Sequence, residues 1–398
     1  MRKIIRLFTA LLSLVCAVIM GFVIVGEATM PSKLVSYTAD SALSPVYSYT
    51  RRDVTADYQV KSTARETVRA FNIFPVKDIT VTNEKAPKVL VSGEVFGIKL
   101  YTDGVVVVGL QSVDTGEGNK ICPASECGIE VGDIVTSING IQVLTSDDVM
   151  AILGDNNGKP YTVKLKRRGR YKTFSLTPVY SPREGSYKAG MWMRDSTAGI
   201  GTLTFYNEKN GSFAALGHQV NDVDTNELMP MLDGEAVAAQ VTGVQQAGAD
   251  SVGSLSCNFK EESIGRLFEN SDTGLYGAYS RINTDAAREF ELASKQEVQK
   301  GYAQIICTID GGKPHAYDIE IIKVSYHRGA EQKDIVFRVT DEELLKKTGG
   351  IVQGMSGSPI VQNDKLIGAV THVIVGNSQK GYAVFAQTMY EKSLELKP

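Results

Sequence analysis

The C-terminal half of the sequence consists of short glycine-rich and β-branched runs, and this pattern limits the possible folds more than any other feature. From residue 181 onward these runs recur at residues 198–205, 211–217, 236–244, 301–309, 319–324, 335–339, 358–361 and 366–375. Helical patterning is confined to residues 285–295 and 341–347. Many short strands with few helices are typical of an antiparallel barrel or sandwich. We therefore expect residues 181–398 to form one mostly-β domain.

The N-terminus carries a second constraint. Arg2, Lys3 and Arg6 precede an almost uninterrupted apolar stretch over residues 7–26. About 20 apolar residues suffice to cross a membrane, and basic flanking residues stay in the cytoplasm. The stretch is long for a cleaved signal, and the Gly-Glu-Ala-Thr that follows is a poor cleavage site. We expect residues 1–26 to be an uncleaved transmembrane anchor, with a cleaved signal as the alternative. Both place the rest of the chain outside the cytoplasm.

The composition excludes some function classes. The chain has 42 Lys+Arg against 45 Asp+Glu, a formal net charge of -3, which argues against a nucleic-acid partner. Its cysteines include no Cys-x-x-Cys pair and no nearby histidine at zinc-ligand spacing. We therefore expect no metal site and no cofactor. Residues 27–87 are irregular and contain four prolines, which indicates mainly a linker or stalk, some of which can pair as strands.

From residue 89 the pattern changes. The valine run at residues 105–108 predicts a buried strand, and Asn139-Gly140 predicts a tight turn. Residues 145–153 predict a short helix capped by Ser146, and residues 161–176 predict two strands around a basic turn.

This order of elements resembles a PDZ domain of the type found beside bacterial proteases, over residues 88–178. Two motifs carry the resemblance, Gly97-Ile98-Lys99-Leu100 and the stretch from Gly128-Ile129 through Gly132-Asp133 to Asn139-Gly140. The first resembles the carboxylate-binding loop of PDZ domains. The resemblance implies that this loop binds a chain-terminal carboxylate through backbone N–H groups, while a peptide ligand adds a strand to the sheet. The alternative is that these glycines only serve turns.

The sharpest local motif is Gly354-Met355-Ser356-Gly357-Ser358-Pro359. A nucleophilic serine needs a general base and backbone N–H groups directed at the developing oxyanion. A glycine two residues before the serine lets the chain turn so that the amides of Gly354 and Ser356 face one point. The layout resembles the active-site loop of chymotrypsin-like serine peptidases, and residues 360–371 continue it as strand, turn and return strand. An ordinary hairpin loop is the alternative.

The general base must be one of four histidines. His218 follows a small-residue strand at residues 213–217 and precedes the serine, as in chymotrypsin-like peptidases. His372, on the predicted return strand, is its main rival, whereas His315 and His327 stand in polar, loop-like surroundings.

A carboxylate should keep the imidazole of the general base in the correct tautomer. The spacing alone leaves the choice open among Asp222, Asp224, Asp250, Asp285 and Asp341.

Longer stretches resemble one family. Residues 339–372, which include Asp341 and Ser356, residues 194–205 and the Ala-Leu-Gly-His at 215–218 are similar to the SpoIVB peptidase family, the stage IV sporulation protein B serine peptidases of family S55. The resemblance implies Ser356, His218 and Asp341 as the catalytic triad. On that basis Asp341→Asn should cut turnover by about 10⁴-fold.

The same resemblance implies a mostly-β architecture of anchor, PDZ domain and chymotrypsin-like β-barrel-type peptidase at residues 181–398. It further implies an endopeptidase that lies in the forespore intermembrane space, cleaves itself and membrane-complex proteins, and signals sigma factor processing in sporulation.

Two other function classes remain open from the sequence. One is a catalytically silent envelope scaffold whose PDZ domain binds a partner. The intact nucleophile, base and oxyanion glycine argue against it. The other is a Ser/Lys or esterase-type hydrolase, for which no Ser-x-x-Lys helix pattern is present.

Overall fold

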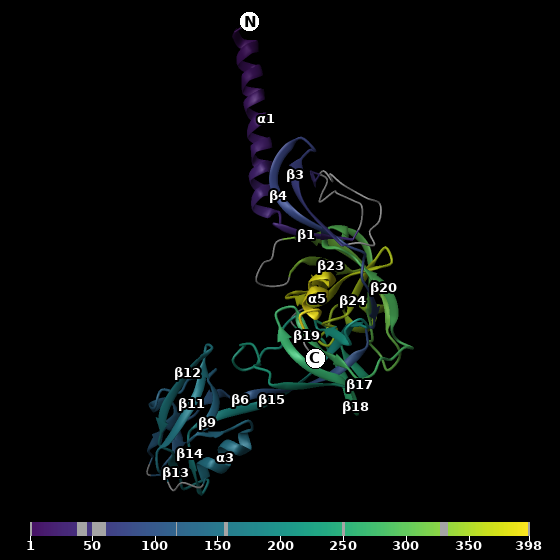
Figure 1. The fold of residues 1–398 in the computed structure, drawn as a ribbon. Helices are drawn as coiled ribbons and strands as arrows, with labels where there is room; N and C mark the ends of the chain where they lie inside the picture. Colours follow the sequence, from purple (N-terminus) through teal and green to yellow (C-terminus); the bar gives the residue numbers. More distant parts are fainter. Residues whose placement is uncertain are drawn as a thin grey trace.

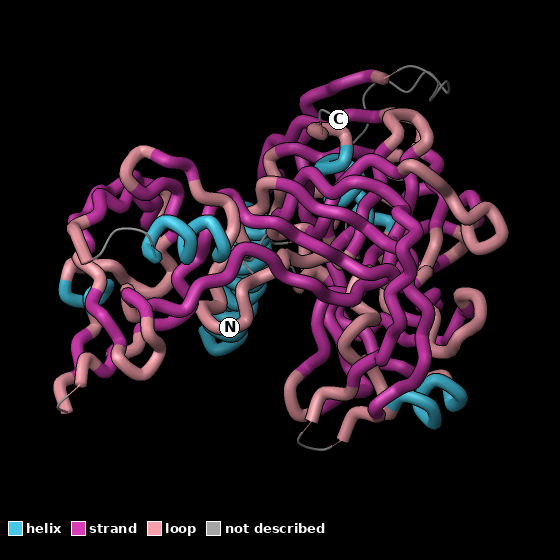
Figure 2. Tube along the Cα trace, turned by 90° about the horizontal axis from the view of Figure 1, so that it is seen from below, coloured by secondary structure: helices cyan, strands magenta, loops and turns pink. Residues whose placement is uncertain are grey.

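The computed structural model describes residues 2–37, 46–49, 61–116, 118–154, 158–248, 251–326 and 333–396. An N-terminal helix leads to a small sheet, then to a large body of strands, with a smaller β-rich module beside it (Figure 1). Strands dominate, and the helices that follow the N-terminal one are few and short (Figure 2). The expected mostly-β fold with an apolar N-terminal helix is confirmed.

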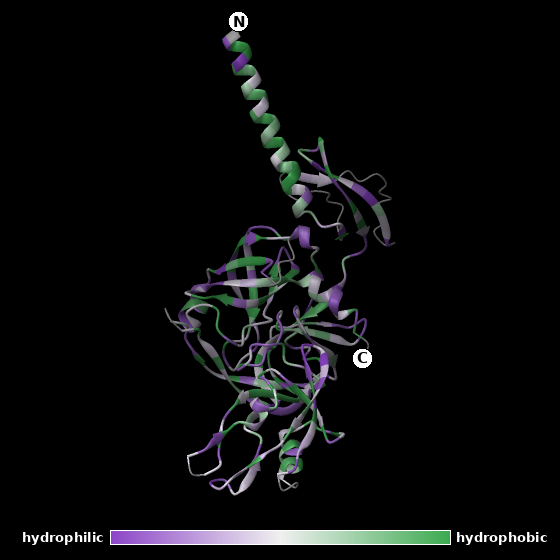
Figure 3. Ribbon diagram, turned by 90° about the vertical axis from the view of Figure 1, so that its left-hand side faces the viewer, coloured by the Kyte–Doolittle hydropathy of each residue, from purple (hydrophilic) through white to green (hydrophobic). Residues whose placement is uncertain are grey.

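Helix α1 spans Arg2–Thr29. Its segment Lys3–Ala28 is long and apolar enough to cross a membrane, and no part of the most apolar window is buried in the protein. Figure 3 shows this helix as a mostly hydrophobic rod that projects from the body. These properties fit a membrane anchor or a signal sequence.

The segment predicted as a linker contains a folded sheet. Four strands pair in the order β1, β4, β3, β2, with bounds Lys33–Ser36, Phe74–Asn83, Ser62–Ala70 and Tyr47–Tyr49. Alternate side chains of these strands form a small core with Tyr49, Val68 and Ile79 at its centre. The Tyr47 hydroxyl donates to the Phe22 carbonyl at 2.7 Å, which fixes the sheet to the end of α1. The sequence pattern was too irregular to reveal these strands.

The body contains two closed rings of strands. In the first ring β6, β15, β16, β19, β18 and β17 pair in turn and β17 returns to β6. Their bounds are Val95–Leu110, Met191–Asn207, Ser212–Ala215, Gly274–Tyr279, Ser254–Ser271 and Asp233–Gln245. Phe96, Leu203, Phe213 and Leu267 fill the interior and are fully buried.

The second ring follows the same principle. Here β21, β22, β23, β26, β25 and β24 pair in turn and β24 returns to β21. Their bounds are Gly301–Cys307, His315–Val324, Ile335–Val339, Asn377–Phe385, Lys365–Ile374 and Pro359–Gln362. Alternation places Ile305, Ile319 and Phe337 inside the ring, whereas their chain neighbours face outward.

Elements between the rings hold them together. Strand β5 (Lys88–Val91) pairs with β15 of the first ring and with β20 (Arg288–Leu292). Strand β20 in turn pairs with β25 of the second ring, and helix α5 (Ala386–Ser393) covers the junction. A single apolar cluster, with Phe205, Tyr276 and Leu366 at its centre, spans this boundary.

The PDZ-like module is an insertion within the first ring. Strands β6 and β15 extend beyond the ring, and their outer halves pair with each other inside the module (Figure 1). Between them lie β7 (Val113–Asp114), β8 (Lys120–Ile121), α2 (Pro123–Glu126), β9 (Ile134–Ile138), β10 (Ile141–Gln142), α3 (Ser146–Gly154), β11 (Tyr161–Arg167), β12 (Arg170–Leu176), β13 (Val179–Ser181) and β14 (Ser186–Lys188). The module has its own core, which includes Val105, Ile138 and Leu165. Residues 88–91 and 95–101, predicted as part of the PDZ domain, belong instead to strands of the large body.

The individual elements test the local expectations. The turn at Asn139-Gly140, the helix α3 and the hairpin β11–β12 form where the sequence predicts them. The cap of α3 differs, because the Thr145 hydroxyl, not that of Ser146, accepts from the Asp148 amide. A predicted helix at residues 285–295 is wrong: β20 occupies this segment and is followed by the short helix η1 (Lys295–Glu297). Pairing with β5 gives these residues a strand conformation that their helical pattern does not show.

One buried ion pair stabilises the PDZ-like module. The guanidinium of Arg167 binds both oxygens of Asp133, each at 2.6 Å, and also reaches the Gly128 carbonyl. The Asp133 side chain is 1% exposed. Removing the cation would leave a buried carboxylate without its counter-charge.

We therefore expect Arg167→Met to lower the free energy of unfolding of the module by about 3–5 kcal/mol. Guanidinium titration can follow this through the fluorescence of Trp192, the single tryptophan, on the module's half of β15. Arg168→Met, on the exposed turn, is the matched control and should change stability by less than about 0.5 kcal/mol. Equal effects of both substitutions would contradict the assignment.

Candidate active site

The Ser356 loop lies between helix α4 (Glu342–Thr348) and strand β24, and strand β15 of the other ring holds it. The Thr202 amide donates to the Ser356 carbonyl at 2.8 Å, and the Thr202 hydroxyl donates to the Gly354 carbonyl at 2.8 Å. The Thr204 hydroxyl donates to the Gly357 carbonyl at 2.7 Å. Both threonines are fully buried. The sequence analysis missed them, although Thr-Leu-Thr inside a buried strand was an available signal.

Two amides of this loop remain free. The amides of Gln353, Met355, Gly357 and Ser358 each donate to a backbone carbonyl. Within the described part of the chain, the amides of Gly354 and Ser356 have no hydrogen-bond acceptor. A trans peptide unit directs its C=O and N–H to opposite sides. The Gln353 carbonyl accepts from the Leu255 amide, so the Gly354 amide of the same peptide unit points away from Leu255. The Met355 carbonyl likewise accepts from the Ser358 amide, so the Ser356 amide points away from Ser358. These are the two amides that the sequence predicts as the oxyanion hole.

Glycine is required at two positions of the loop. Gly354 has φ of 100° and Gly357 has φ of 93°, a region that residues with a side chain rarely adopt. A Cβ on Gly357 would also collide with the Thr202 carbonyl oxygen and lie 2.5 Å from the Leu216 nitrogen. The Ser356 loop is thus in direct contact with the strand end that precedes His218.

His218 follows β16 on that strand end. The Leu216 amide donates to the Thr202 carbonyl at 3.3 Å, so Thr202 binds both the Ser356 loop and the His218 strand end. The His218 Nδ1 lies 2.7 Å from the Gln219 carbonyl oxygen. Since a carbonyl can only accept, the neutral ring carries its proton on Nδ1 and leaves the Nε2 lone pair free.

The His372 ring stacks beside His218. The two ring centroids are 4.6 Å apart with an angle of 35° between the planes. His218 is half-buried, whereas His372 is exposed. Burial, and then the neighbouring His372, lower the pKa of His218 to about 4, although the Gln219 carbonyl opposes this shift. His218 is therefore neutral at physiological pH and able to accept a proton.

The Ser356 hydroxyl donates to the Thr371 carbonyl on β25, at 2.9 Å. The side chain is half-buried. In this conformation the hydroxyl proton is directed at the return strand and not at an imidazole. A change of the Ser356 side-chain rotamer is needed before a base can remove this proton.

Asp341 does not join these residues. It is the N-cap of α4, where its Oδ1 accepts from the Leu344 amide at 2.9 Å. Its Oδ2 accepts from the Asp318 amide at 3.3 Å. Both oxygens thus bind backbone amides, and the Nδ1 position of His218, where a triad carboxylate would bind, faces Gln219.

The other candidate carboxylates are also engaged elsewhere. Asp222 and Asp224 bind Arg194 at 2.6 and 2.7 Å, and Asp285 pairs with Lys313 at 3.8 Å. Asp250 and His327 lie outside the described residues. His315 is at the start of β22 and lines a separate pocket.

The predicted carboxylate-binding loop is not a loop. Gly97, Ile98, Lys99 and Leu100 lie inside β6, which pairs with β15 along one edge and with β17 along the other. Their backbone pairs with neighbouring strands of the first ring on both edges, and Ile98 and Leu100 are buried in the core of this ring. The prediction of a carboxylate site at these residues is therefore wrong, because β6 continues through both the ring and the PDZ-like module.

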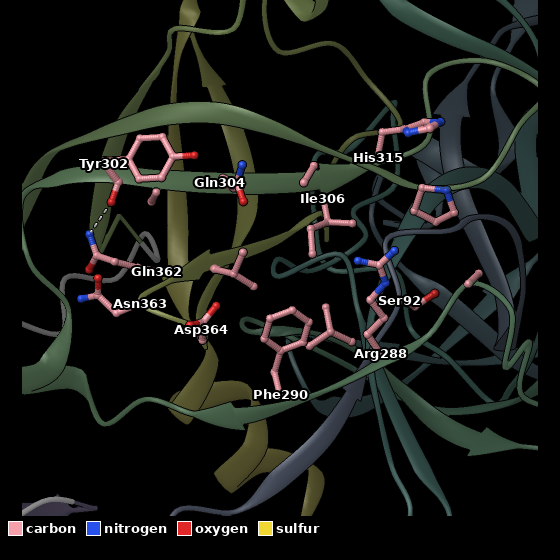
Figure 4. Close-up of a pocket in the computed structure, with 16 residues that line it drawn as sticks. Ser92, Arg288, Phe290, Tyr302, Gln304, Ile306, His315, Gln362, Asn363 and Asp364 are labelled. Carbon is pink, nitrogen blue, oxygen red and sulfur yellow. Dashed lines mark hydrogen bonds between the residues drawn. The ribbon is translucent and has the colours of Figure 1, made fainter.

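A pocket of about 510 Å³ lies on the outside of the second ring. Figure 4 shows Arg288 and Phe290 from β20 facing Tyr302, Gln304 and Ile306 from β21 across it. Gln362 closes one end by donating to the Tyr302 carbonyl at 3.0 Å. None of Ser356, His218 and Asp341 lines this pocket, so it is separate from the candidate catalytic residues. The described residues also contain no group of three or more His, Cys, Asp or Glu side chains placed to hold a metal ion.

Comparisons with known proteins identify the families to which the two parts of the chain are similar. A family model described as SpoIVB peptidase S55 matches residues 185–390, and one described as a PDZ domain matches residues 117–167. Two curated relatives are proteins provisionally named as zinc metalloproteases. One, from Lactococcus lactis subsp. lactis, is 25% identical over 108 residues, which are 27% of this chain and 23% of that protein. The other, from Clostridium acetobutylicum, is 27% identical over 107 residues, which are 26% of this chain and 32% of that protein. The chain thus spans a third or less of the length of these relatives.

A solved structure of the PDZ domain of an SdrC-like protein from Listeria monocytogenes is also similar. It has 20% identity and a TM-score of 0.19, and it covers 23% of this chain and 87% of that one. The peptidase family match covers more than half of the chain and contains both Ser356 and His218. The chain therefore belongs to the SpoIVB peptidase S55 family and is a serine peptidase with a PDZ domain.

Proposed function

We propose that the protein is a membrane-tethered endopeptidase in which Ser356 is the nucleophile and His218 the general base. The pair of free amides at Gly354 and Ser356 carries this proposal, since neighbouring amides of the same loop are all bonded. Two unpaired N–H groups beside a serine form an oxyanion hole, which stabilises the charge that develops on the scissile carbonyl oxygen.

The reaction begins when the Ser356 hydroxyl leaves the Thr371 carbonyl and turns toward Nε2 of His218. Its oxygen bonds to the scissile carbonyl carbon, and its proton passes to Nε2. The amides of Gly354 and Ser356 bind the resulting oxyanion. The C–N bond then breaks as His218 returns the proton to the leaving amine, and water hydrolyses the acyl-enzyme by the same route. The Gln219 carbonyl replaces a carboxylate as the acceptor for Nδ1–H.

The resemblance to stage IV sporulation protein B peptidases extends the proposal. The enzyme acts outside the cytoplasm, cleaves itself and membrane-complex proteins, and thereby signals sigma factor processing during sporulation. Helix α1 supports membrane attachment, because Lys3–Ala28 satisfies the length and hydropathy of a single span. The PDZ-like module supports a peptide or protein ligand as a second partner.

The first prediction concerns the nucleophile. The full-length chain in detergent micelles should react with a fluorophosphonate probe and cleave itself over time, whereas Ser356→Ala should do neither. Labelling followed on gels, with circular dichroism to show that both proteins are folded, measures this. If folded wild-type protein neither labels nor cleaves, the silent-scaffold function takes precedence.

A second prediction separates two roles of Asp341. Because asparagine is as good an N-cap as aspartate, Asp341→Asn should retain the labelling rate within about threefold. Asp341→Ala, which removes the cap, should destabilise the protein by about 1 kcal/mol. A triad role predicts instead that Asp341→Asn lowers the rate by about 10⁴-fold. Labelling rates and thermal unfolding of both variants decide between the two roles.

A third prediction concerns pH. Labelling requires neutral His218, and its pKa is lowered to about 4, so the rate should rise through about pH 4 and stay level from pH 6 to 8. His372→Phe keeps an aromatic ring against His218 but removes the neighbouring charge, which is the second cause of the lowered pKa of His218, after burial. The midpoint of the pH profile should therefore move upward, toward the ordinary value of about 6.5. An unchanged midpoint in this variant would exclude His218 as the titrating group.

A further inference from the structure

Arg194 lies where the PDZ-like module meets the peptidase body. It is on β15, opposite Val106 of β6, within the half of the strand that belongs to the module. Its guanidinium leaves the module and binds two carboxylates of the body, Asp222 Oδ2 at 2.6 Å and Asp224 Oδ2 at 2.7 Å. The side chain is 28% exposed, whereas that of Asp222 is 2% exposed. The charge-assisted contact with Asp222 is therefore largely buried, whereas Asp224, whose side chain is 46% exposed, binds at the surface.

Asp222 organises the hairpin that follows His218. Its Oδ1 accepts from the Asp224 amide, the Thr225 amide and the Thr225 hydroxyl, at 3.1, 2.9 and 3.1 Å. Its backbone amide donates to the Glu227 carbonyl at 2.9 Å. Burial raises the pKa of Asp222, but the hydrogen bonds from Thr225 and Arg194 have the larger combined effect and hold the pKa below its ordinary value. The carboxylate is thus charged, and both of its oxygens accept hydrogen bonds.

The base of this hairpin, residues 219–229, is fixed to the first ring. Asn221 and Leu228 form a bridge, and the Met229 amide donates to the Val220 carbonyl at 3.0 Å. Asn270 on β18 both accepts from the Val220 amide and donates to its carbonyl, each at 2.8 Å. The hairpin is therefore held at its base by β18 and at its tip by Arg194.

Gln219, whose carbonyl sets the tautomer of His218, is the first residue of this hairpin. The Gln219 side chain also donates to Asn221 Oδ1 at 2.8 Å, within the same unit. A shift of the hairpin would move this carbonyl away from Nδ1. Because no described carboxylate holds the imidazole, the position of this single carbonyl determines which nitrogen can act as the base.

We propose that Arg194 is a positioning residue of the peptidase, which holds the hairpin at residues 219–229 and thereby keeps the Gln219 carbonyl on His218 Nδ1. This inference rests on the proposed role of His218. It also gives the PDZ-like module a physical connection to the catalytic base, because Arg194 moves with the module's half of β15. The Glu227 carboxylate of the hairpin also lies near Gly132 of the module, since a Cβ added at Gly132 would be 3.1 Å from Glu227 Oε2.

The test uses the full-length chain in detergent micelles and four variants: Arg194→Gln, Arg194→Lys, Asp222→Asn, and Arg194→Gln with Asp222→Asn. Asp222→Asn retains the Oδ1 hydrogen bonds and replaces Oδ2, the charged acceptor that Arg194 binds, with an NH2 donor. Arg266→Gln is the matched control, since Arg266 also pairs with an aspartate, Asp233 at 2.7 Å, on the first ring but outside the hairpin. Thermal unfolding verifies that each variant is folded.

We expect Arg194→Gln and Asp222→Asn each to slow fluorophosphonate labelling by about 10- to 100-fold, as for a misplaced catalytic group. The double variant should be no slower than the slower single variant, because both act on one interaction. Arg194→Lys should be intermediate, since lysine cannot bind two carboxylates in a fixed fork. Arg266→Gln should label at the wild-type rate.

The ¹⁵N NMR spectrum of the protein with labelled histidine gives an independent readout. The chain has four histidines, so the spectrum contains few signals. His218 should show one tautomer, protonated on Nδ1, in the wild type, and a mixture in Arg194→Gln and Asp222→Asn. Wild-type rates together with an unchanged tautomer in these variants would overturn the inference, as would fully additive effects. If the wild-type protein does not label at all, the proposed function fails, whereas the tautomer still decides the role of Arg194.

Discussion

The hydrogen bonds of Thr202 are the interaction on which the rest of the site depends. From one buried residue of β15, the amide binds the Ser356 carbonyl, the hydroxyl binds the Gly354 carbonyl, and the carbonyl accepts from Leu216. The nucleophile loop belongs to the second ring and the histidine strand end to the first, so neither ring alone contains the site. Thr202 sets their spacing and directs the Gly354 and Ser356 carbonyls toward β15. Catalytic geometry in this protein is therefore a property of the junction between the rings.

The resting conformation differs from that of an assembled triad. The Ser356 hydroxyl is bonded to Thr371, the imidazole proton is bonded to a backbone carbonyl, and the family's aspartate caps a helix. The amides of Gly354 and Ser356, by contrast, already lack other acceptors among the described residues. A neutral carbonyl orients an imidazole but does not stabilise an imidazolium as a carboxylate does, which favours a weaker base.

The candidate catalytic residues could be proposed from the sequence, whereas the module boundaries could not. Gly354, Ser356 and His218 are local features with a chemical reason for their order, and the amides of Gly354 and Ser356 have no acceptor among the described residues. Their catalytic roles stay a prediction. The helix α4 was predicted from the helical pattern of residues 341–347, whereas Asp341, which caps it, was assigned to catalysis by resemblance. The sequence could not indicate that β6 continues from the ring into the PDZ-like module, because Gly97–Leu100 satisfies the pattern of a loop and of a buried strand equally. Pairing with both β15 and β17 is a non-local property that no local pattern contains.

The insertion of the PDZ-like module between β6 and β15 also affects how the chain reaches its native state. The first ring closes only when Val95 pairs with Thr202, and these partners are separated by more than 100 positions in the sequence. Contacts between such distant residues are slow to form, because the loop between them must first lose its entropy. A module that folds on its own core brings the two strands together before the ring closes. Folding of this insert therefore shortens the search for the pairing that closes the ring.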